Sequence, residues 1–115
     1  MANQTDLGAV QIRNDVIVSI AALAAGEVAG VVGIWQGPFL SRLFLPSRSG
    51  VRVEIQDQEV RLWLDLVAEY GVNLPQVAMD VQDRVREMVE QMTHLSAAEV
   101  HVSIHQIKPK RSDRP

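Results

Sequence analysis

Two runs of alternating apolar and polar residues, joined by Asp57 and Gln58, constrain the fold of this chain more than any other feature. Residues 51–55 form the first run, and residues 60–68 form a second, longer one. This alternation predicts an antiparallel hairpin over 51–68, because successive side chains of a strand point to opposite faces of a sheet. One face of the hairpin is then apolar and must be covered by another layer of structure.

Two amphipathic patterns supply candidates for the covering layer. Apolar residues recur at intervals of three and four over 15–28 and again over 73–92, which predicts two helices. The second helix should begin after Asn73, where Gln76 would complete a capping box.

The first predicted helix has an unusual composition. It should begin at Asn14 or Asp15, whose side chains can accept hydrogen bonds from the free N–H groups of a helix start. From there residues 16–25 carry no charge, and Ser19 is their only polar residue. A helix that is apolar on all sides is expected to be largely buried, or covered by another chain.

Shorter apolar or alternating stretches predict three further strands, at 8–12, 31–35 and 100–105. The order of elements is therefore β-α-β-β-β-α-β. The economical packing is a two-layer α/β (α+β) sandwich, in which both helices cover one face of a mixed sheet. The 115 residues fit one domain over 1–107, and we interpret the basic tail at 108–115 as disordered.

Composition excludes several classes of protein. The chain has no cysteine, which rules out a disulfide framework, a thiolate zinc site and a cysteine nucleophile, and which fits a cytoplasmic protein. Its net charge of -3 gives no general attraction to nucleic acid, so no nucleic-acid partner is expected. Residues 16–25 are too few to span a bilayer, which takes ~20, and residues 1–7 lack the layout of a signal peptide. We therefore expect no direct membrane insertion.

No motif predicts a catalytic, cofactor-binding or metal site. Residues 30–33 match the GxxG pattern of some RNA-binding loops, but they lack a basic residue, and we interpret them as a helix stop and a turn. His101 and His105 would share one face of a strand, where a rise of ~3.3 Å per residue places them ~13 Å apart. Because one zinc ion needs ligands at ~2 Å, this pair alone cannot hold it. We expect no cofactor, and we interpret the two histidines as part of a polar sheet face.

An aromatic residue flanked by charges is the first candidate for a contact with another protein. Trp63 shares with Arg61 and Asp65 the hairpin face opposite the apolar one. Aromatic and arginine side chains are enriched at the centres of protein interfaces. If the helices cover the apolar face, Trp63 meets solvent or a partner; the alternative is that it packs under a loop or the tail.

A proline-bounded apolar segment at 37–46 is the second candidate. If it forms a helical turn, one side of that turn gathers four large side chains, Phe39, Leu40, Leu43 and Phe44. Such a set is costly to expose, so it should be covered by the protein's own core, by a second chain or by a membrane surface.

Several short motifs also occur in a fixed order over residues 8–107. They are Gly8-Ala9-Val10-Gln11-Ile12, Gly26-Glu27-Val28-Ala29-Gly30-Val31, Gly50-Val51-Arg52-Val53, Glu69-Tyr70-Gly71-Val72-Asn73-Leu74, Val81-Gln82-Asp83-Arg84-Val85, Met92-Thr93-His94-Leu95 and Val100-His101-Val102-Ser103-Ile104. In order and spacing they resemble the bacterial alkaline shock protein family, also called the general stress or envelope stress response family.

The resemblance implies a small cytoplasmic α/β protein without known catalytic residues. Members of the family look like self-associating proteins that an integral-membrane anchor protein can hold at the inner face of the membrane. Where the family often has glycine after Met-Thr, this chain has His94, at a position expected to end the helix in a left-handed conformation. Residues 39–45 fall where the family is variable and often more polar, so a partner docked there would be particular to this protein.

Together these observations predict a non-catalytic, self-associating interaction or scaffold protein of the envelope stress response. We expect a homo-oligomer that is cytoplasmic or peripheral at the inner membrane face. An integral-membrane anchor protein is its expected partner. The candidate contact residues are Trp63, Arg61, Phe39, Leu40, Leu43 and Phe44. Two other hypotheses are a small nucleic-acid-binding α/β module and an enzyme whose site, over His101, Ser103 and His105, is shared between subunits.

Overall fold

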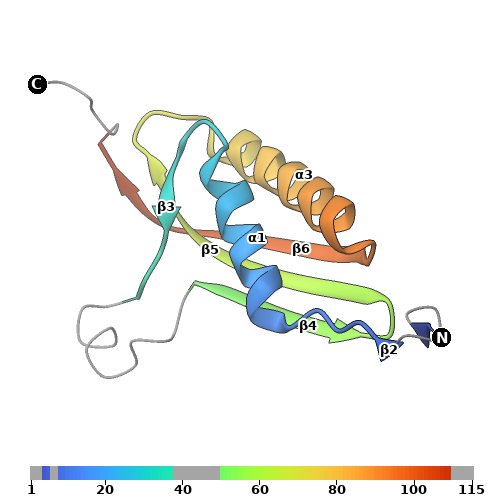
Figure 1. The fold of residues 1–115 in the computed structure, drawn as a ribbon. Helices are drawn as coiled ribbons and strands as arrows, with labels where there is room; N and C mark the ends of the chain where they lie inside the picture. Colours follow the sequence, from blue (N-terminus) through green and yellow to red (C-terminus); the bar gives the residue numbers. More distant parts are fainter. Residues whose placement is uncertain (1–3, 6–7, 38–49, 110–115) are drawn as a thin grey trace, which may run out of the picture.

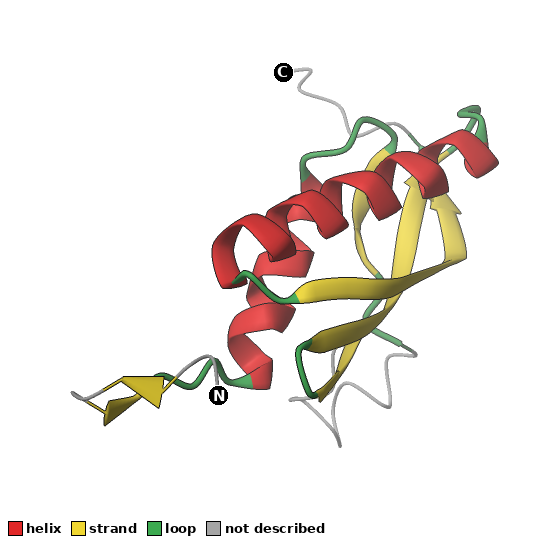
Figure 2. Cartoon of the chain, turned by 90° about the vertical axis from the view of Figure 1, so that its right-hand side faces the viewer, coloured by secondary structure: helices red, strands yellow, loops and turns green. Residues whose placement is uncertain are grey.

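The computed structural model describes residues 4–5, 8–37 and 50–109. Within them, two helices lie on one face of a four-stranded sheet, and a two-stranded ribbon precedes them (Figure 1). In chain order the elements are β1 (Gln4–Thr5), β2 (Gly8–Ala9), α1 (Asn14–Gly26), β3 (Val31–Ile34), β4 (Val51–Gln56), β5 (Glu59–Glu69), α3 (Leu74–Thr93) and β6 (Ser96–Lys108). The predicted α+β class and two-layer sandwich are confirmed, and Figure 2 shows both helices on one side of the strands.

Strand β5 is the centre of the sheet. Strand β6 pairs with it in parallel along its whole length. The antiparallel partners β3 and β4 therefore share its other edge, with β4 beside the first half of β5 and β3 beside the second. The sheet is mixed, as predicted.

The hairpin of β4 and β5 is the predicted one. Its turn contains Asp57, whose φ of 58° lies in the left-handed region that Asp tolerates better than most residues. The register pairs Val51 with Leu64 and Val53 with Leu62, so all four side chains point to the helices. All four are buried in the core beneath α1 and α3.

Each helix buries one stripe against this face. The stripe of α1 contains Ile17, Ile20, Ala21 and Ala24, and the stripe of α3 contains Val77, Val81, Val85 and Val89. The four-residue spacing in α3 follows from the helical period, which returns a residue to the same face after about one turn. Fully burying a valine or isoleucine side chain contributes roughly 1.5–3 kcal/mol, so the two stripes hold the layers together.

The ends of α3 confirm two predictions. The side chain of Asn73 accepts a hydrogen bond from the backbone N–H of Gln76 at 3.1 Å, as an N-cap does. At the other end, His94 is left-handed, with a φ of 61°, and its N–H donates to the carbonyl of Glu90. The left-handed cap therefore forms without the glycine that favours it.

The start of α1 differs from the prediction. The N-cap is Arg13, and no side chain caps the helix. The amide of Asn14 instead donates to the carbonyl of Val53 at 3.3 Å, because α1 crosses β4 there. The Asn14 side chain, which the sequence predicts to cap the helix, thus forms a contact between the two layers instead.

Two strands also differ in extent. The predicted strand at 8–12 is reduced to β2, which pairs with β1 in the separate ribbon rather than with the main sheet. Beyond β2, Ile12 packs against the helical core, so residues 10–13 lead into α1 instead of extending a strand. The last strand is longer than predicted, because β5 pairs with it from Ser96 to Lys108, with two irregularities at which one residue of β6 has no partner.

Candidate interaction surface

The sheet face away from the helices carries a layer of aromatic and charged side chains. Residues of β5 that alternate with its buried leucines, Arg61, Trp63 and Asp65, all lie on this face and are half-buried. The register places Trp63 between Arg52 of β4 and His101 of β6. We call this layer the open sheet face.

Trp63 is held between its two neighbours on the open sheet face. The Arg52 guanidinium carbon lies 4.5 Å from the centroid of the indole, and the His101 ring is stacked on it at 5.4 Å with 11° between the planes. Because β4 and β6 flank β5 on opposite sides, the two groups approach opposite faces of the indole. The predicted position of Trp63, on the sheet face opposite the core, is confirmed.

A second stack lies further along the sheet. Trp35, just past β3, stacks on His105 with ring centroids 4.3 Å apart and 11° between the planes. His105 is the extra residue of a bulge in β6, and its Nε2 lies 3.1 Å from the carboxylate of Asp65. The backbone N–H of Trp35 donates to the carbonyl of Asp65 at 2.8 Å, which fixes Trp35 beside β5.

Several charges of the open sheet face are paired. The carboxylate of Glu99 contacts His101 Nε2 at 2.8 Å and Arg61 Nε at 3.3 Å. The hydrogen bond from His101, followed by the one from Arg61, lowers the pKa of Glu99 below its ordinary value. Because these side chains are partly exposed, solvent screens the attraction, and the pairs fix orientation more than they add stability.

The arrangement favours stacking and hydrogen bonding over proton transfer. His101 and His105 each contact a different carboxylate and a different indole. In the described part of the chain, no three metal-ligating side chains gather closely enough to hold an ion. Among the same residues, no helix has the length and apolar character needed to cross a membrane.

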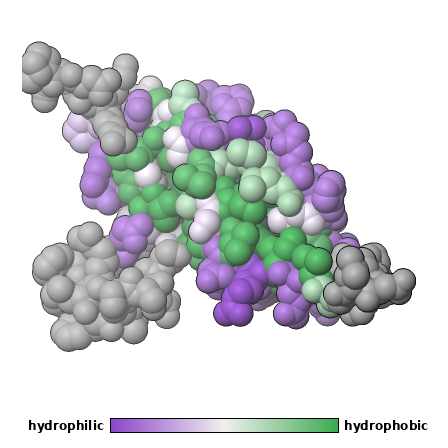
Figure 3. Space-filling model, in the orientation of Figure 1, coloured by the Kyte–Doolittle hydropathy of each residue, from purple (hydrophilic) through white to green (hydrophobic). Residues whose placement is uncertain are grey.

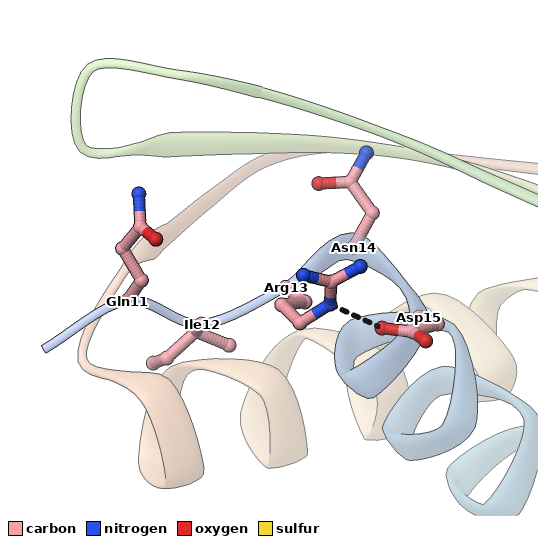
Figure 4. Close-up of a pocket in the computed structure, with 5 residues that line it drawn as sticks. All are labelled: Gln11, Ile12, Arg13, Asn14 and Asp15. Atoms are coloured by element: carbon pink, nitrogen blue, oxygen red, sulfur yellow. Dashed lines mark ion pairs between the residues drawn. The ribbon is translucent and has the colours of Figure 1, made fainter.

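A hollow of about 530 Å³ lies at the start of α1, lined by Gln11, Ile12, Arg13, Asn14 and Asp15 (Figure 4). Arg13 and Asp15 form an ion pair there, with Nε and Oδ1 3.8 Å apart. The lining residues are consecutive in the chain, so this hollow lacks the convergence of distant segments that small-molecule sites have.

The candidate contact residues fall into two groups. Trp63 and Arg61 lie on the open sheet face, whereas Phe39, Leu40, Leu43 and Phe44 lie outside the described residues. Of the tail predicted over 108–115, Lys108 belongs to β6, and residues 110–115 lie outside the described residues. Trp35 is not predicted from the sequence, because nothing local indicates that its partner is His105, 70 positions along the chain. The uncharged helix is predicted, and one side of α1 is exposed, with Leu23 at 69%.

Comparison with known proteins adds a family and a fold. Residues 2–109 match the profile of the alkaline shock protein 23 family, described as having a cell envelope-related function. Protein YqhY of Bacillus subtilis (strain 168) is 34% identical over 105 residues, which are 87% of this chain and 77% of that protein. A protein of Streptococcus pyogenes serotype M3 called a stress response regulator gls24 homolog is 34% identical over 109 residues. The alignment covers 90% of this chain but 60% of the streptococcal protein.

Solved structures share the fold at low sequence identity. A copper form of the MamM CTD has a TM-score of 0.52 and 16% identity, covering 80% of this chain and 95% of that one. A nickel form gives the same TM-score at 17% identity. These matches cover most of the two-layer sandwich, and they show a common architecture.

Proposed function

Because this chain belongs to the alkaline shock protein 23 family, we propose that it is a non-catalytic, self-associating interaction or scaffold protein of the envelope stress response. The family's cell envelope-related description supports the place of action. The name of the streptococcal relative, a stress response regulator homolog, supports the link to stress.

The open sheet face is the observation that carries the proposal. It holds a half-buried Trp63 fixed between Arg52 and His101, with the ion pair of Arg61 and Glu99 beside it. A rigid aromatic centre with a polar rim is the composition that protein interfaces favour. Because the neighbours already hold the indole in place, a partner would lose little side-chain entropy on binding it.

The same geometry argues against the nucleic-acid alternative. Proteins that bind single-stranded nucleic acid through a sheet stack bases on the faces of aromatic rings. The indole of Trp63 is already engaged by the Arg52 guanidinium and by the stacked His101 ring, which compete with a base for its faces. The net charge of -3 adds no attraction for phosphate.

The enzyme alternative has less support than the interaction hypothesis. The histidines that would form a shared site are each engaged by a separate carboxylate on the same chain. We propose that their role is to position the two indoles.

We further propose that the protein is cytoplasmic and is recruited to the inner face of the membrane by an integral-membrane anchor protein. A protein that acts at the envelope needs a contact with it, and the family's description supports such a contact. In fractionated cells, the protein should sediment with membranes and be released by a chaotropic wash. If only detergent releases the protein from the membranes, attachment through a protein is contradicted.

Replacement of Trp63 tests the interaction role. We expect Trp63→Ser to weaken self-association by about tenfold or more, since truncating an aromatic centre typically costs over 1 kcal/mol of binding. The measurement is the mass of the purified chain by light scattering over a range of concentrations. Tyr70→Ser is the matched control, because Tyr70 is 80% exposed at the end of the same strand.

Circular dichroism decides between the two roles of Trp63. A folded Trp63→Ser variant with weaker association supports the proposal. An unfolded variant would mean that Trp63 stabilises the chain itself, and a wild-type chain that stays monomeric at every concentration would contradict self-association.

A further inference from the structure

One side of α1 is apolar and exposed. Val16 is 47% exposed and Leu23 is 69% exposed, and Ser19 and Gly26 lie on the same side of the helix. The helix has no charged residue from position 16 to position 26. Figure 3, which views the molecule from the side of α1, shows a band of apolar surface over this helix, with pale patches between the green ones. We call Val16, Ser19, Leu23 and Gly26 the α1 seam.

The spacing of the α1 seam is that of a helix pair. Positions 16, 19, 23 and 26 are separated by three, four and three residues, which is the a and d pattern of a heptad. The opposite side of α1 already packs on the sheet and on α3. The α1 seam is therefore spaced to pack against one additional helix, supplied from outside this fold.

The sizes of the seam residues suggest what that helix is. Residues 16 and 23 are the a positions, and residues 19 and 26 are the d positions. When two such helices run antiparallel, each a position of one helix faces a d position of the other. Val16 then faces Gly26 of a second copy, and Leu23 faces its Ser19. Every large side chain meets a small one, so both kinds of residue pair, Val16 with Gly26 and Leu23 with Ser19, pack without a gap or a clash. In a parallel pair like residues would meet, which crowds Leu23 against its copy and leaves a gap at Gly26.

We propose that the α1 seam is the contact between two copies of this chain, related by a two-fold axis with the α1 helices antiparallel. The inference rests on the self-association proposed above and adds to it a second contact surface, on the opposite side of the molecule from the contact proposed at Trp63.

The one polar group of the seam is already satisfied. The hydroxyl of Ser19 donates to the carbonyl of Asp15 at 3.1 Å within the same helix. A second copy would therefore bury this hydroxyl without leaving a donor unpaired, which would otherwise cost about 1–3 kcal/mol.

The charges at the two ends of α1 also suit a second copy. Arg13 pairs with Asp15 at the start of the helix, and Glu27 at its end pairs with Arg84 of α3 at 2.7 Å. Antiparallel packing brings the start of one helix beside the end of the other. Each end of the contact then holds the carboxylates of Asp15, Glu27 and Glu87 and the guanidinium groups of Arg13 and Arg84, since Arg84 also pairs with Glu87 at 3.2 Å. Each of these groups already has an ion-pair partner within its own chain.

Apolar surface continues beyond the helix. A stable interface buries about 800 Å² on each partner, which is more than four helix residues supply. Val10, four positions before α1, is 67% exposed, and the apolar band of Figure 3 continues toward the segment that precedes the helix. This segment extends the seam.

A charge placed in the α1 seam tests the inference. In the full chain, we expect Leu23→Glu to weaken self-association by at least about tenfold, because the two-fold axis places two carboxylates in one apolar contact. Met79→Glu is the matched control: Met79 is also a large apolar helix residue, 55% exposed, but it lies on α3. Sedimentation over a range of concentrations gives the association constants, and circular dichroism checks that both variants fold.

Cross-linking tests the antiparallel arrangement separately. The chain has no cysteine, so a Ser19→Cys variant mixed with a Leu23→Cys variant can form a disulfide only across two copies. We expect this mixture to cross-link at least about tenfold faster than a mixture of Met79→Cys with Leu23→Cys, because a disulfide needs Cα atoms roughly 4.4–6.8 Å apart.

The outcomes separate this inference from the proposed function. If the wild-type chain associates and Leu23→Glu associates equally well, the α1 seam is wrong while self-association stands. Equal cross-linking rates in the two mixtures would overturn the antiparallel pair. If the wild-type chain is a monomer at every concentration, both proposals fail.

Discussion

Single residues on the open sheet face gain their roles from partners far away in the chain. Glu99 is an ordinary polar position in the alternating pattern of β6, yet its carboxylate links His101 of the same strand to Arg61 of β5. The sequence predicts a polar face here, and that is correct. It does not predict which charges meet, because strand register depends on the packing of the whole sheet.

The lowered pKa of Glu99 gives a pH prediction. A carboxylate whose pKa is lower in the folded state contributes stability above its ordinary pKa, and the contribution is lost as the pH falls through the folded value. We therefore expect the Glu99 pair to act at neutral pH and to fail only in the acidic range. A carboxyl-carbon NMR titration of the native chain should place the pKa of Glu99 below that of a free glutamate.

Replacing the histidines identifies the cause of this pKa. In His101→Ala the pKa of Glu99 should rise toward its ordinary value, but only partly, since Arg61 remains. His105→Ala is the control, because His105 contacts Asp65 instead. A pKa that moves equally in both variants would contradict the assignment.

Gly30 gives a second prediction at the scale of one residue. It joins α1 to β3 with a φ of 97°, and an added Cβ would lie 2.8 Å from a methyl carbon of Val77. We expect Gly30→Ala to lower the free energy of unfolding by about 1–3 kcal/mol, as measured by urea denaturation. In Gly33→Ala, where a Cβ meets no atom within 4 Å, the change should be much smaller. Equal losses in the two variants would refute this reading of Gly30.

At the scale of elements, α3 stabilises β6 through its side as well as its buried stripe. Gln82 and Arg86 donate to the carbonyls of Val100 and Ala97 at 3.0 and 3.2 Å. One turn further on, Glu90 accepts from the N–H of Ala97 at 2.9 Å. The helical pattern of the sequence shows these three residues only as polar. Their bonds to a strand edge become visible once the helix is placed on the sheet.

The N-cap of α3 provides the prediction at this scale. Asn73→Ala should lower the free energy of unfolding by about 1 kcal/mol, since it removes the acceptor for the N–H of Gln76. Gln76→Ala is the control. The Gln76 side chain donates to Asp80 instead of returning to Asn73, so its loss should change stability by less than about 0.5 kcal/mol. A larger loss in the Gln76 variant would mean that a full capping box forms.

At the scale of the whole molecule, the sequence predicts the layers better than their surfaces. Periodicity locates both helices and the hairpin over 51–68, and the element order leads to the mixed two-layer sandwich. The uncharged helix could be either buried or covered by another chain, and periodicity alone does not decide. The fold shows that α1 is buried on one side only, since the sheet and α3 reach that side and leave Leu23 exposed. The ribbon of β1 and β2 could not be foreseen for a similar reason, since a short alternating stretch pairs with whatever neighbour the chain provides.

The parallel pairing of β5 with β6 has a consequence for synthesis of the protein. Among the described strands, the neighbour that pairs with β5 along its full length comes from residues 96–108, which are made after α3. On the ribosome, a growing chain that has reached the end of the hairpin therefore still has one edge of β5 open and its apolar face uncovered by α3. The nascent protein is then most prone to aggregate during the interval in which residues 70–108 are added, and a chaperone that binds apolar strands would find its target in that interval.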